Sequence, residues 1–306
     1  MTKSAFVFRV LCSLNIFFII IAVFPFYIPP VNVSAATGPA PVITDSSPPP
    51  SFSPDRPEQN SAVYLLPAMA TDGADTDKPV YDPYTVTERK EKKLPAALPD
   101  VKPYYGVKTV YLTFDDGPDR YNTPLVLDIL KKNGIKATFF VVGTQVEKSA
   151  PLLKRIYNEG HAIGNHSYNH IYRQLYRSPA AYMEQLRHND QIIKRILGVR
   201  PRIARAPGGT VGSFTKQYWT LLKEEGYTDI SWNVSSGDAS RAKAADLVQN
   251  VIYQMQNKYL WSHAIVLMHD GPGHGETVKA LPSIIKYFKD NGFEFKVVNL
   301  KTPPAW

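Results

Sequence analysis

At residues 110–118 the chain reads Val110-Tyr111-Leu112-Thr113-Phe114-Asp115-Asp116-Gly117-Pro118. The β-branched and aromatic residues at its start predict a strand, and the Gly-Pro pair predicts a turn at its end. Side chains alternate along a strand, so Asp115 and Asp116 can share a pocket only where the strand stops. Two carboxylates there can divide the work of a metal ligand and a general base. A plain surface turn is the competing interpretation, and the rest of the chain must decide.

From about Lys108 onward, short apolar strands alternate with amphipathic helical segments. We expect strands at Thr109–Phe114, Ala137–Val142, Ala162–Asn165, Arg202–Ala204, Asp229–Asn233, Ile265–Met268 and Phe293–Val298. We expect helices at Pro124–Asn133, Val146–Glu159, Pro179–Leu197, Thr215–Glu225, Ala244–Asn257 and Thr277–Asn291. This alternation predicts a parallel sheet, open or closed into a barrel, with functional residues at the carboxyl ends of its strands.

Polar side chains follow four of the later strands. These segments are 165–170, 205–209, 235–238 and 269–272. Together with the first strand end they bring Asp, His and Arg side chains to one face of the domain. A surface turn does not explain this distribution, which therefore favours a functional site.

His166 and His170 are four residues apart, so on a helical turn they would share one face and could bind one cation. An isolated pair of this kind is more often structural. An Asp from a neighbouring strand end would complete a His₂-carboxylate site with open positions. Zinc is the default ion, and cobalt or another divalent transition metal would fit the same ligands. His274, in a Gly-rich loop, is a weaker candidate at the rim of the pocket.

Five motifs occur in order: Thr-Phe-Asp-Asp-Gly-Pro, His-Ser-x-x-His, Arg-x-Pro, a Gly-Asp loop and Leu-x-His. In this order they resemble the polysaccharide deacetylases, the NodB-homology enzymes of carbohydrate esterase family 4. The resemblance covers roughly residues 105–300. It implies a distorted (β/α) barrel of parallel strands and the hydrolysis of N-acetyl groups on a sugar polymer.

The resemblance also implies a role for each matching residue. The metal ligands would be Asp116, His166 and His170. Asp115 would be the general base that takes a proton from water. His269 would be the general acid that protonates the leaving amine.

The remaining family positions would support these groups. Arg205 would hold Asp115 charged and oriented, and Asp238 would hold His269 protonated, because an opposite charge nearby favours the charged form. Gly208 would offer its backbone N–H to the oxyanion. The other expected contacts to substrate are Pro207, Leu267 and Trp232.

The chain departs from the family pattern at two motifs. The family usually has an aromatic residue after the proline of Arg-x-Pro, and here it is Gly208, so we expect a lost groove wall and a more open groove. In the fourth motif Ser235 replaces an Asp and Ala239 replaces a Trp, while Asp238 remains. Candidate residues for stacking on a sugar are Trp232, Tyr168 and Tyr172. Pro207 is at a position that is hydroxylated in some bacterial members.

The N-terminal residues predict export. A basic start, a long apolar run and small residues near Ala35 and Ala36 predict that residues 1–36 are a signal peptide or an uncleaved membrane anchor. The proline-rich residues 37–104 predict a largely disordered linker, and its charged end, 88–93, predicts a solvated face. Residues 105–306 would form the catalytic domain.

The composition limits the kinds of binding partner that we expect. The chain has a formal net charge of +8, which favours an anionic cell-wall surface. A basic stripe with interleaved aromatic residues is missing, which argues against nucleic acid. The single cysteine, Cys12, lies in the apolar run, so a cleaved chain would rely on its hydrophobic core. We expect a monomer by default.

These observations predict a secreted, wall-associated or anchored metal-dependent enzyme that deacetylates N-acetylglucosamine residues, with peptidoglycan as the favoured polymer. Chitin oligomers, N-acetylmuramic acid and acetylated xylan are alternatives within the same chemistry. A non-catalytic wall-binding protein with the same fold is an alternative of another class. A metal hydrolase acting on small cyclic amides is a third, although it would need no export signal.

Overall fold

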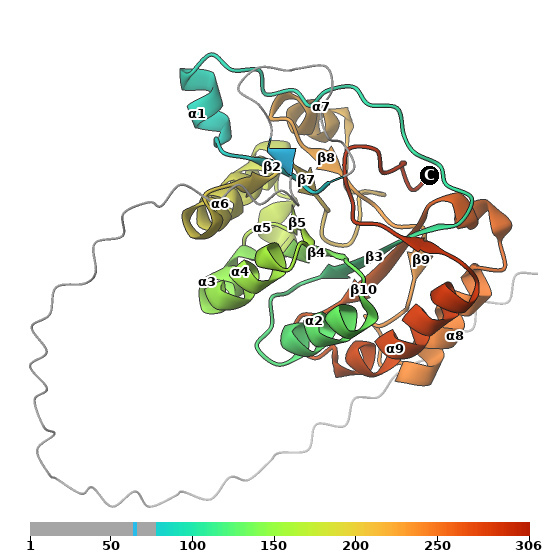
Figure 1. The fold of residues 1–306 in the computed structure, drawn as a ribbon. Coiled ribbons are helices and arrows are strands. Elements are labelled where there is room, and N and C mark those ends of the chain that lie inside the picture. The colour runs from blue at the N-terminus through green and yellow to red at the C-terminus, as the bar shows by residue number, and fades with distance from the viewer. Residues whose placement is uncertain (1–63, 66–77) are drawn as a thin grey trace, which may run out of the picture. The chain divides into compact units, whose positions relative to one another are not determined.

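The computed structural model describes residues 64–65 and 78–306 of the chain, so the expected leader and most of the expected linker lie outside the described residues. Its centre is an eight-stranded parallel sheet in the order β8-β7-β5-β4-β3-β10-β9, with β11 paired to β3 (Figure 1). The strands are β3 Thr109–Asp115, β4 Thr138–Val141, β5 Ala162–Asn165, β7 Ile203–Ala204, β8 Thr228–Asp229, β9 Val234–Ser235, β10 Ala264–His269 and β11 Glu294–Phe295. The sheet curls into an incomplete barrel, which confirms the predicted fold class.

The middle strand, β3, is buried on both faces. Its seven residues are all buried, as expected for a parallel strand covered on both sides. Leu112 and Phe114 belong to the core beneath the helices, whereas Tyr111 faces a smaller apolar cluster on the concave side. His269 of β10 pairs with Asp115, so the ends of these two strands are level.

The helices follow the predicted pattern, and Figure 1 shows α2, α8 and α9 together along one part of the sheet and α3, α4 and α6 along another. Their bounds are α2 Asn122–Asn133, α3 Gly143–Lys148, α4 Ala150–Asn158, α5 Tyr172–Leu175, α6 Pro179–Leu197, α7 Lys216–Glu224, α8 Ala244–Gln254 and α9 Gly275–Asp290. Helix α6 has the predicted limits: Ser178 caps it by accepting a hydrogen bond from the Ala181 N–H, and Gly198 ends it with φ +78°.

Several predicted elements were wrong in their limits, among them the strand expected at Phe293–Val298, which is only Glu294–Phe295. The helix expected at Val146–Glu159 is two helices that meet at Ser149, because Pro151 at the start of α4 has no N–H to continue a helix. Of the strand expected at Asp229–Asn233, only Asp229 lies in a strand, at the end of β8, and the other four residues form the gap between β8 and β9. The carbonyl groups of Ile230 and Ser231 in this gap accept hydrogen bonds from the Arg205 side chain.

The largest difference lies in the expected linker. Residues Val80–Asp82 form β2 and residues Val86–Glu91 form α1, and β2 pairs antiparallel with β6, Arg200–Pro201. A short strand β1, Tyr64–Leu65, pairs with the other edge of β2. The prediction that the linker runs to residue 104 is therefore wrong from Val80 onward.

The N-terminal segment of β2 and α1 is held by buried charges. Asp82 is fully buried, and its Oδ2 accepts hydrogen bonds from Arg89 at 2.6 Å and Arg200 at 3.1 Å, and a shorter one from Arg202. Residues 90–93 are exposed, as predicted for the solvated face at 88–93, but Arg89 is an exception at 0% exposure. Composition could not reveal this, because the charges are buried by pairing with one another.

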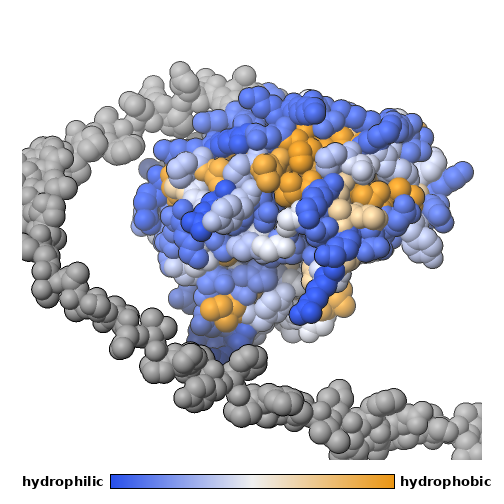
Figure 2. Space-filling model, turned by 90° about the horizontal axis from the view of Figure 1, so that it is seen from below, coloured by the Kyte–Doolittle hydropathy of each residue, from blue (hydrophilic) through white to orange (hydrophobic). Residues whose placement is uncertain are grey.

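One face of the molecule is largely polar (Figure 2). Figure 2 shows one face on which hydrophilic residues surround separate apolar patches. Among the residues that the structure describes, no helix has the length and apolar character to cross a bilayer.

Candidate active site

Three potential metal ligands meet where β3 and β5 end. Asp116 follows β3, and its Oδ1 lies 3.5 Å from Nε2 of His166 and 3.2 Å from Nε2 of His170. The histidines lie in a loop and not on the expected helical turn. The backbone is left-handed at Ser167 (φ +70°) and His170 (φ +57°). The ring centroids of His166 and His170 are 5.1 Å apart, so the predicted histidine pair forms, but with loop geometry.

The donor atoms of this triangle suit a divalent cation. Asp116 Oδ1 is buried and has no hydrogen-bond partner. Bonds of about 2.0–2.1 Å at tetrahedral angles place ligand atoms roughly 3.3 Å apart, close to the two distances above. His166 Nδ1 lies 2.8 Å from the carbonyl oxygen of Arg205, which only accepts, so Nδ1 carries the proton and Nε2 keeps its lone pair. Burial lowers the pKa of His166 to about 3, which keeps the ring neutral.

Helix α6 holds the histidine loop from behind. Asn189 is fully buried, and its Nδ2 donates to the carbonyl oxygens of Val141 and Ser167 and to Asn165 Oδ1. Gln185 Oε1 accepts the backbone N–H groups of residues 168 and 169 at 3.1 Å each. Sequence reasoning missed both side chains. The available signal was two polar residues, four apart, on the otherwise apolar face of a helix.

Asp115 and Arg205 form the predicted ion pair. Asp115 Oδ1 accepts from Arg205 Nη1 at 2.9 Å, and both side chains are almost fully buried. The guanidinium also lies 4.2 Å from the ring centroid of Phe140 and donates to Thr113 Oγ1. Burial raises the pKa of Asp115 above its ordinary value, although the charges of Arg205 and His269 act to lower it. Arg205 thus orients the carboxylate but does not dominate its pKa, and a raised pKa improves a general base.

His269 and Asp238 form the second predicted pair. His269 Nδ1 lies 2.8 Å from Asp238 Oδ1, and Asp238 Oδ2 accepts from the His269 backbone N–H and from Thr277 Oγ1. Burial acts to lower the pKa of His269, but the bond to Asp238 and the charge of Asp115 raise it to about 9. The imidazole is therefore protonated at neutral pH, as a general acid requires.

His274 lies against this acid pair. Its ring is 4.8 Å from the His269 ring at an angle of 21°, and its Nδ1 is 4.0 Å from Asp238 Oδ2. These three residues could form a second cluster of metal ligands. The two imidazole planes are nearly parallel, however, and both Asp238 oxygens already accept hydrogen bonds, so the first cluster fits a cation better. The structure thus places His274 beside the predicted acid.

The residues after His269 pack against Asp116 and the start of α2. The sequence analysis did not predict these contacts. Asp270 is buried and accepts a 2.5 Å hydrogen bond from Thr123 Oγ1, and burial raises its pKa to about 7. A Cβ at Gly271 would lie 2.6 Å from Asp116 Cβ. Only glycine lets the backbone pass this close to the proposed ligand.

The residues expected to contact substrate differ in their surroundings and exposure. Gly208 has φ +71°, and a Cβ there would lie 2.8 Å from the Tyr172 hydroxyl oxygen. The space beside Gly208 is therefore occupied by the ring of Tyr172, so an aromatic side chain lies there although residue 208 has none. Pro207 accepts a 2.5 Å hydrogen bond from Tyr176, while Leu267 is buried at 9% exposure.

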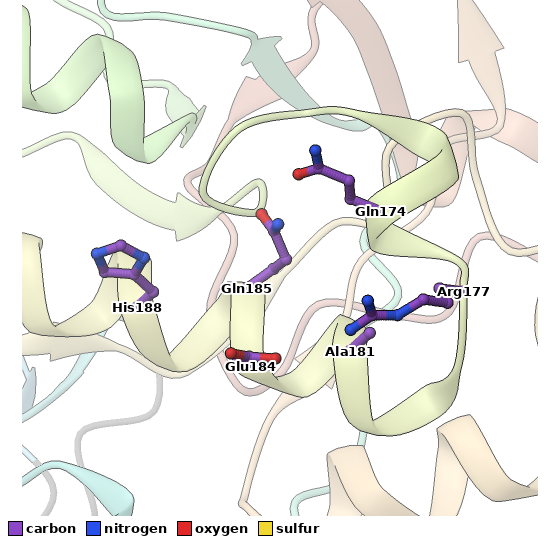
Figure 3. A pocket seen from close by; sticks show the side chains of 6 residues that line it. All are labelled: Gln174, Arg177, Ala181, Glu184, Gln185 and His188. Carbon is purple, nitrogen blue, oxygen red and sulfur yellow. The ribbon is translucent and has the colours of Figure 1, made fainter.

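Within the described residues, neither Trp232 nor Tyr168 has a contact with a proposed ligand ring like that of Tyr172. Trp232 packs on the concave apolar cluster, and its ring approaches Gly209. Tyr168 stacks on His188 with centroids 3.9 Å apart. A cavity of about 310 Å³ lies between α5, its connection to α6, and α6 itself (Figure 3), and none of its lining residues is a predicted metal ligand or acid–base residue.

Comparison with known proteins agrees with this geometry. Residues 102–230 match the family described as Polysaccharide deacetylase. A peptidoglycan-N-acetylglucosamine deacetylase of Bacillus cereus is 34% identical over 195 residues, covering 62% of this chain and 68% of the relative. The chain belongs to the polysaccharide deacetylase family. Members of this family are hydrolases that act on amide bonds.

Two further relatives extend the comparison. A chitooligosaccharide deacetylase of a Bradyrhizobium species is 33% identical over 201 residues, covering 62% of this chain and 88% of the relative. The solved catalytic domain of a peptidoglycan N-acetylglucosamine deacetylase from Eubacterium rectale is 34% identical, with a TM-score of 0.60, covering 69% of this chain and 96% of that one. The polysaccharide deacetylase described here thus has relatives named for two different polymers.

Proposed function

We propose that this polysaccharide deacetylase removes N-acetyl groups from N-acetylglucosamine residues, with peptidoglycan as its polymer. The observation that carries the proposal is the triangle of Asp116, His166 and His170, whose buried carboxylate oxygen has no partner, with the Asp115 and His269 pairs beside it. Asp115 and His269 themselves lie on adjacent strands at the same level, so a base and an acid can act on one reacting group.

The protein's own groups supply the proton transfers. A divalent cation, most simply Zn²⁺, would be held by Asp116, His166 and His170 and would polarise the acetyl carbonyl and activate water. Asp115 takes a proton from the water that adds to the carbonyl carbon. His269 gives a proton to the nitrogen as the carbon–nitrogen bond breaks, which yields acetate and a free amine.

Gly208 suits the developing negative charge on the carbonyl oxygen. Within the described residues its backbone N–H donates no hydrogen bond, so it is free for an oxyanion. Arg205 and Asp238 orient the base and the acid through the contacts described above. Pro207 lies in the same loop and is fixed by Tyr176.

Three considerations support peptidoglycan over the alternatives. Relatives at about a third identity carry that name, the chain is basic, and its first residues predict export by a signal peptide or anchor. We propose a secreted or wall-associated location on this basis. Chitin oligomers are the second candidate, favoured by the Bradyrhizobium relative, while N-acetylmuramic acid, xylan and small cyclic amides have weaker support.

The test is acetate release from purified peptidoglycan and from chitin oligomers, with and without a chelator. We expect release from peptidoglycan that stops on chelation and returns with zinc or cobalt. An enzyme that keeps full activity after exhaustive chelation would refute the metal proposal. Asp115→Asn, with unchanged shape and metal ligands, should abolish release; if release persists, the proposed base is wrong. If the unaltered protein binds wall polymer but releases no acetate, the wall-binding alternative holds.

A further inference from the structure

Tyr172, the first residue of α5, stands between two parts of the proposed site. Its ring meets His170 edge-on, with centroids 5.4 Å apart at 82°. Its other neighbour is Gly208: a Cβ there would lie 2.9 Å from Tyr172 Cε1 and 3.3 Å from Cζ. Despite both contacts, half of Tyr172 remains exposed (50%). The ring is thus fixed on one side by the site and open to solvent on the other.

A second tyrosine fixes this arrangement. The Tyr176 ring lies 5.9 Å from that of Tyr172, and its hydroxyl donates to the Pro207 carbonyl oxygen at 2.5 Å. Helix α5 is therefore tied to the loop that carries Gly208. Burial and the charges of Asp116 and Asp115 raise the pKa of Tyr172, which agrees with a hydroxyl near both carboxylates.

We propose that Tyr172 is a substrate-binding residue whose exposed ring supports the sugar that carries the acetyl group, and that Gly208 lacks a side chain so that this ring can lie there. This assignment rests on the proposed function. Aromatic rings commonly line ligand sites because they offer a large rigid apolar face, and the C–H face of a pyranose matches it.

The other two stacking candidates do not have this position. Trp232 packs against the concave apolar cluster, and Tyr168 is stacked on His188. Ile171, which precedes Tyr172, is also exposed (46%) and extends the apolar surface beside His170. Of the three candidates, Tyr172 alone contacts both a proposed metal ligand and the proposed oxyanion loop.

The test compares Tyr172→Ala and Tyr172→Phe in the metal-loaded enzyme. Acetate release from N-acetylglucosamine tetramers gives KM and kcat, and competition by acetohydroxamate reports on the same centre without a sugar ring. We expect Tyr172→Ala to raise KM about tenfold with kcat unchanged, and Tyr172→Phe to behave as the unaltered enzyme. The inhibition constant of acetohydroxamate should not change. Tyr253→Ala, at an exposed ring (73%) on α8, is the matched control and should leave KM unchanged.

Each other result has a distinct meaning. An unchanged KM in Tyr172→Ala overturns the assignment. Equal weakening of the tetramer and of acetohydroxamate also overturns it, because Tyr172 would then act by positioning His170; metal content measured in the same samples would show this directly. If the unaltered protein turns over no N-acetylglucosamine substrate, the proposed function fails, and the assignment fails with it.

Discussion

Asp82 and Asp116 both lie among ionisable side chains, but they differ in how many of their oxygens are satisfied. Every acceptor of Asp82 is used: Oδ1 receives the Tyr84 N–H, and Oδ2 receives the arginines Arg89, Arg200 and Arg202. Asp116 instead has a buried Oδ1 with no hydrogen-bond partner, although two histidine nitrogens lie within 3.5 Å. One cluster is complete without any added group, and the other is not.

The difference teaches how a structural charge cluster can be told from a functional one. Burying a carboxylate is costly unless its lone pairs are satisfied. At Asp82 burial acts to raise the pKa, but the Arg89 hydrogen bond and the charges of Arg200 and Arg202 outweigh it, so the pKa is lowered. An unsatisfied buried oxygen calls for an explanation, and at Asp116 the two histidine nitrogens beside it point to a bound cation.

The largest expected effect is at the incomplete cluster. Asp116→Asn should lower acetate release about a thousandfold, because a lost ligand removes several kcal/mol of transition-state stabilisation. In the presence of chelator its free energy of unfolding should not fall, since the carboxylate it replaces is unsatisfied. Acetate release, elemental analysis and urea unfolding measure these effects. If Asp116→Asn keeps the metal content and activity of the unaltered enzyme, Asp116 is not a metal ligand.

The complete cluster should respond in stability. Asp82→Asn removes the carboxylate that Arg89, Arg200 and Arg202 share and leaves only Asp190 as a carboxylate partner of Arg200, so we expect a loss of about 3–5 kcal/mol in the free energy of unfolding. The protein that stays folded should lose far less activity than Asp116→Asn. Denaturant unfolding monitored by circular dichroism checks the first point. A loss below about 1 kcal/mol would show that the N-terminal segment is not held by these charges.

A third prediction concerns pH at the acid pair. His269 is protonated below its raised pKa of about 9, so activity that needs this proton should be present at neutral pH and fall as pH rises through that value. Asp238→Asn removes the charge that raises the pKa, so the alkaline limb of kcat/KM should move to lower pH. The pH profile of both enzymes tests this, and an unmoved limb would mean that another group sets it.

The smallest effect is expected at an exposed ion pair, which serves as the control for the buried cluster at Asp82. Lys279 and Glu276 on α9 lie 2.7 Å apart, with 68% and 31% of their side chains exposed. Lys279→Ala should change the free energy of unfolding by less than about 0.5 kcal/mol, because solvent screens such pairs. A larger loss in the same urea experiment would mean that the difference seen at Asp82 does not come from burial.

The elements that sequence predicted well are those whose signals are local. Helix α6 has a capping serine, a proline at its start and a terminal glycine, and β3 is a continuous apolar run. The Asp115 and His269 pairings span 90 and 31 residues and were expected only from the family resemblance, whereas the positions of these residues at the ends of strands could be predicted locally. Such signals require only a residue and its near neighbours in sequence.

The elements that were missed depend on partners distant in sequence. Asp82 meets Arg200 and Arg202, more than a hundred residues away, so a window around 78–104 shows only charge and proline. Asn189 is similarly explained only by the loop it holds. The His166 loop adopts left-handed backbone at Ser167 and His170, non-glycine positions where no propensity rule predicts it.

The pairing of β2 with β6 shows that the folded domain begins before the residues that match the family. The family match begins at residue 102, yet strand β2, whose Asp82 pairs with Arg200 and Arg202, ends before it. A protein trimmed to the match would keep every proposed ligand, base and acid but would bury two cations without a counter-charge at Asp82. Production of this enzyme in shortened form should therefore start upstream of Val80, and relatives grafted at the family boundary would need their own substitute for Asp82.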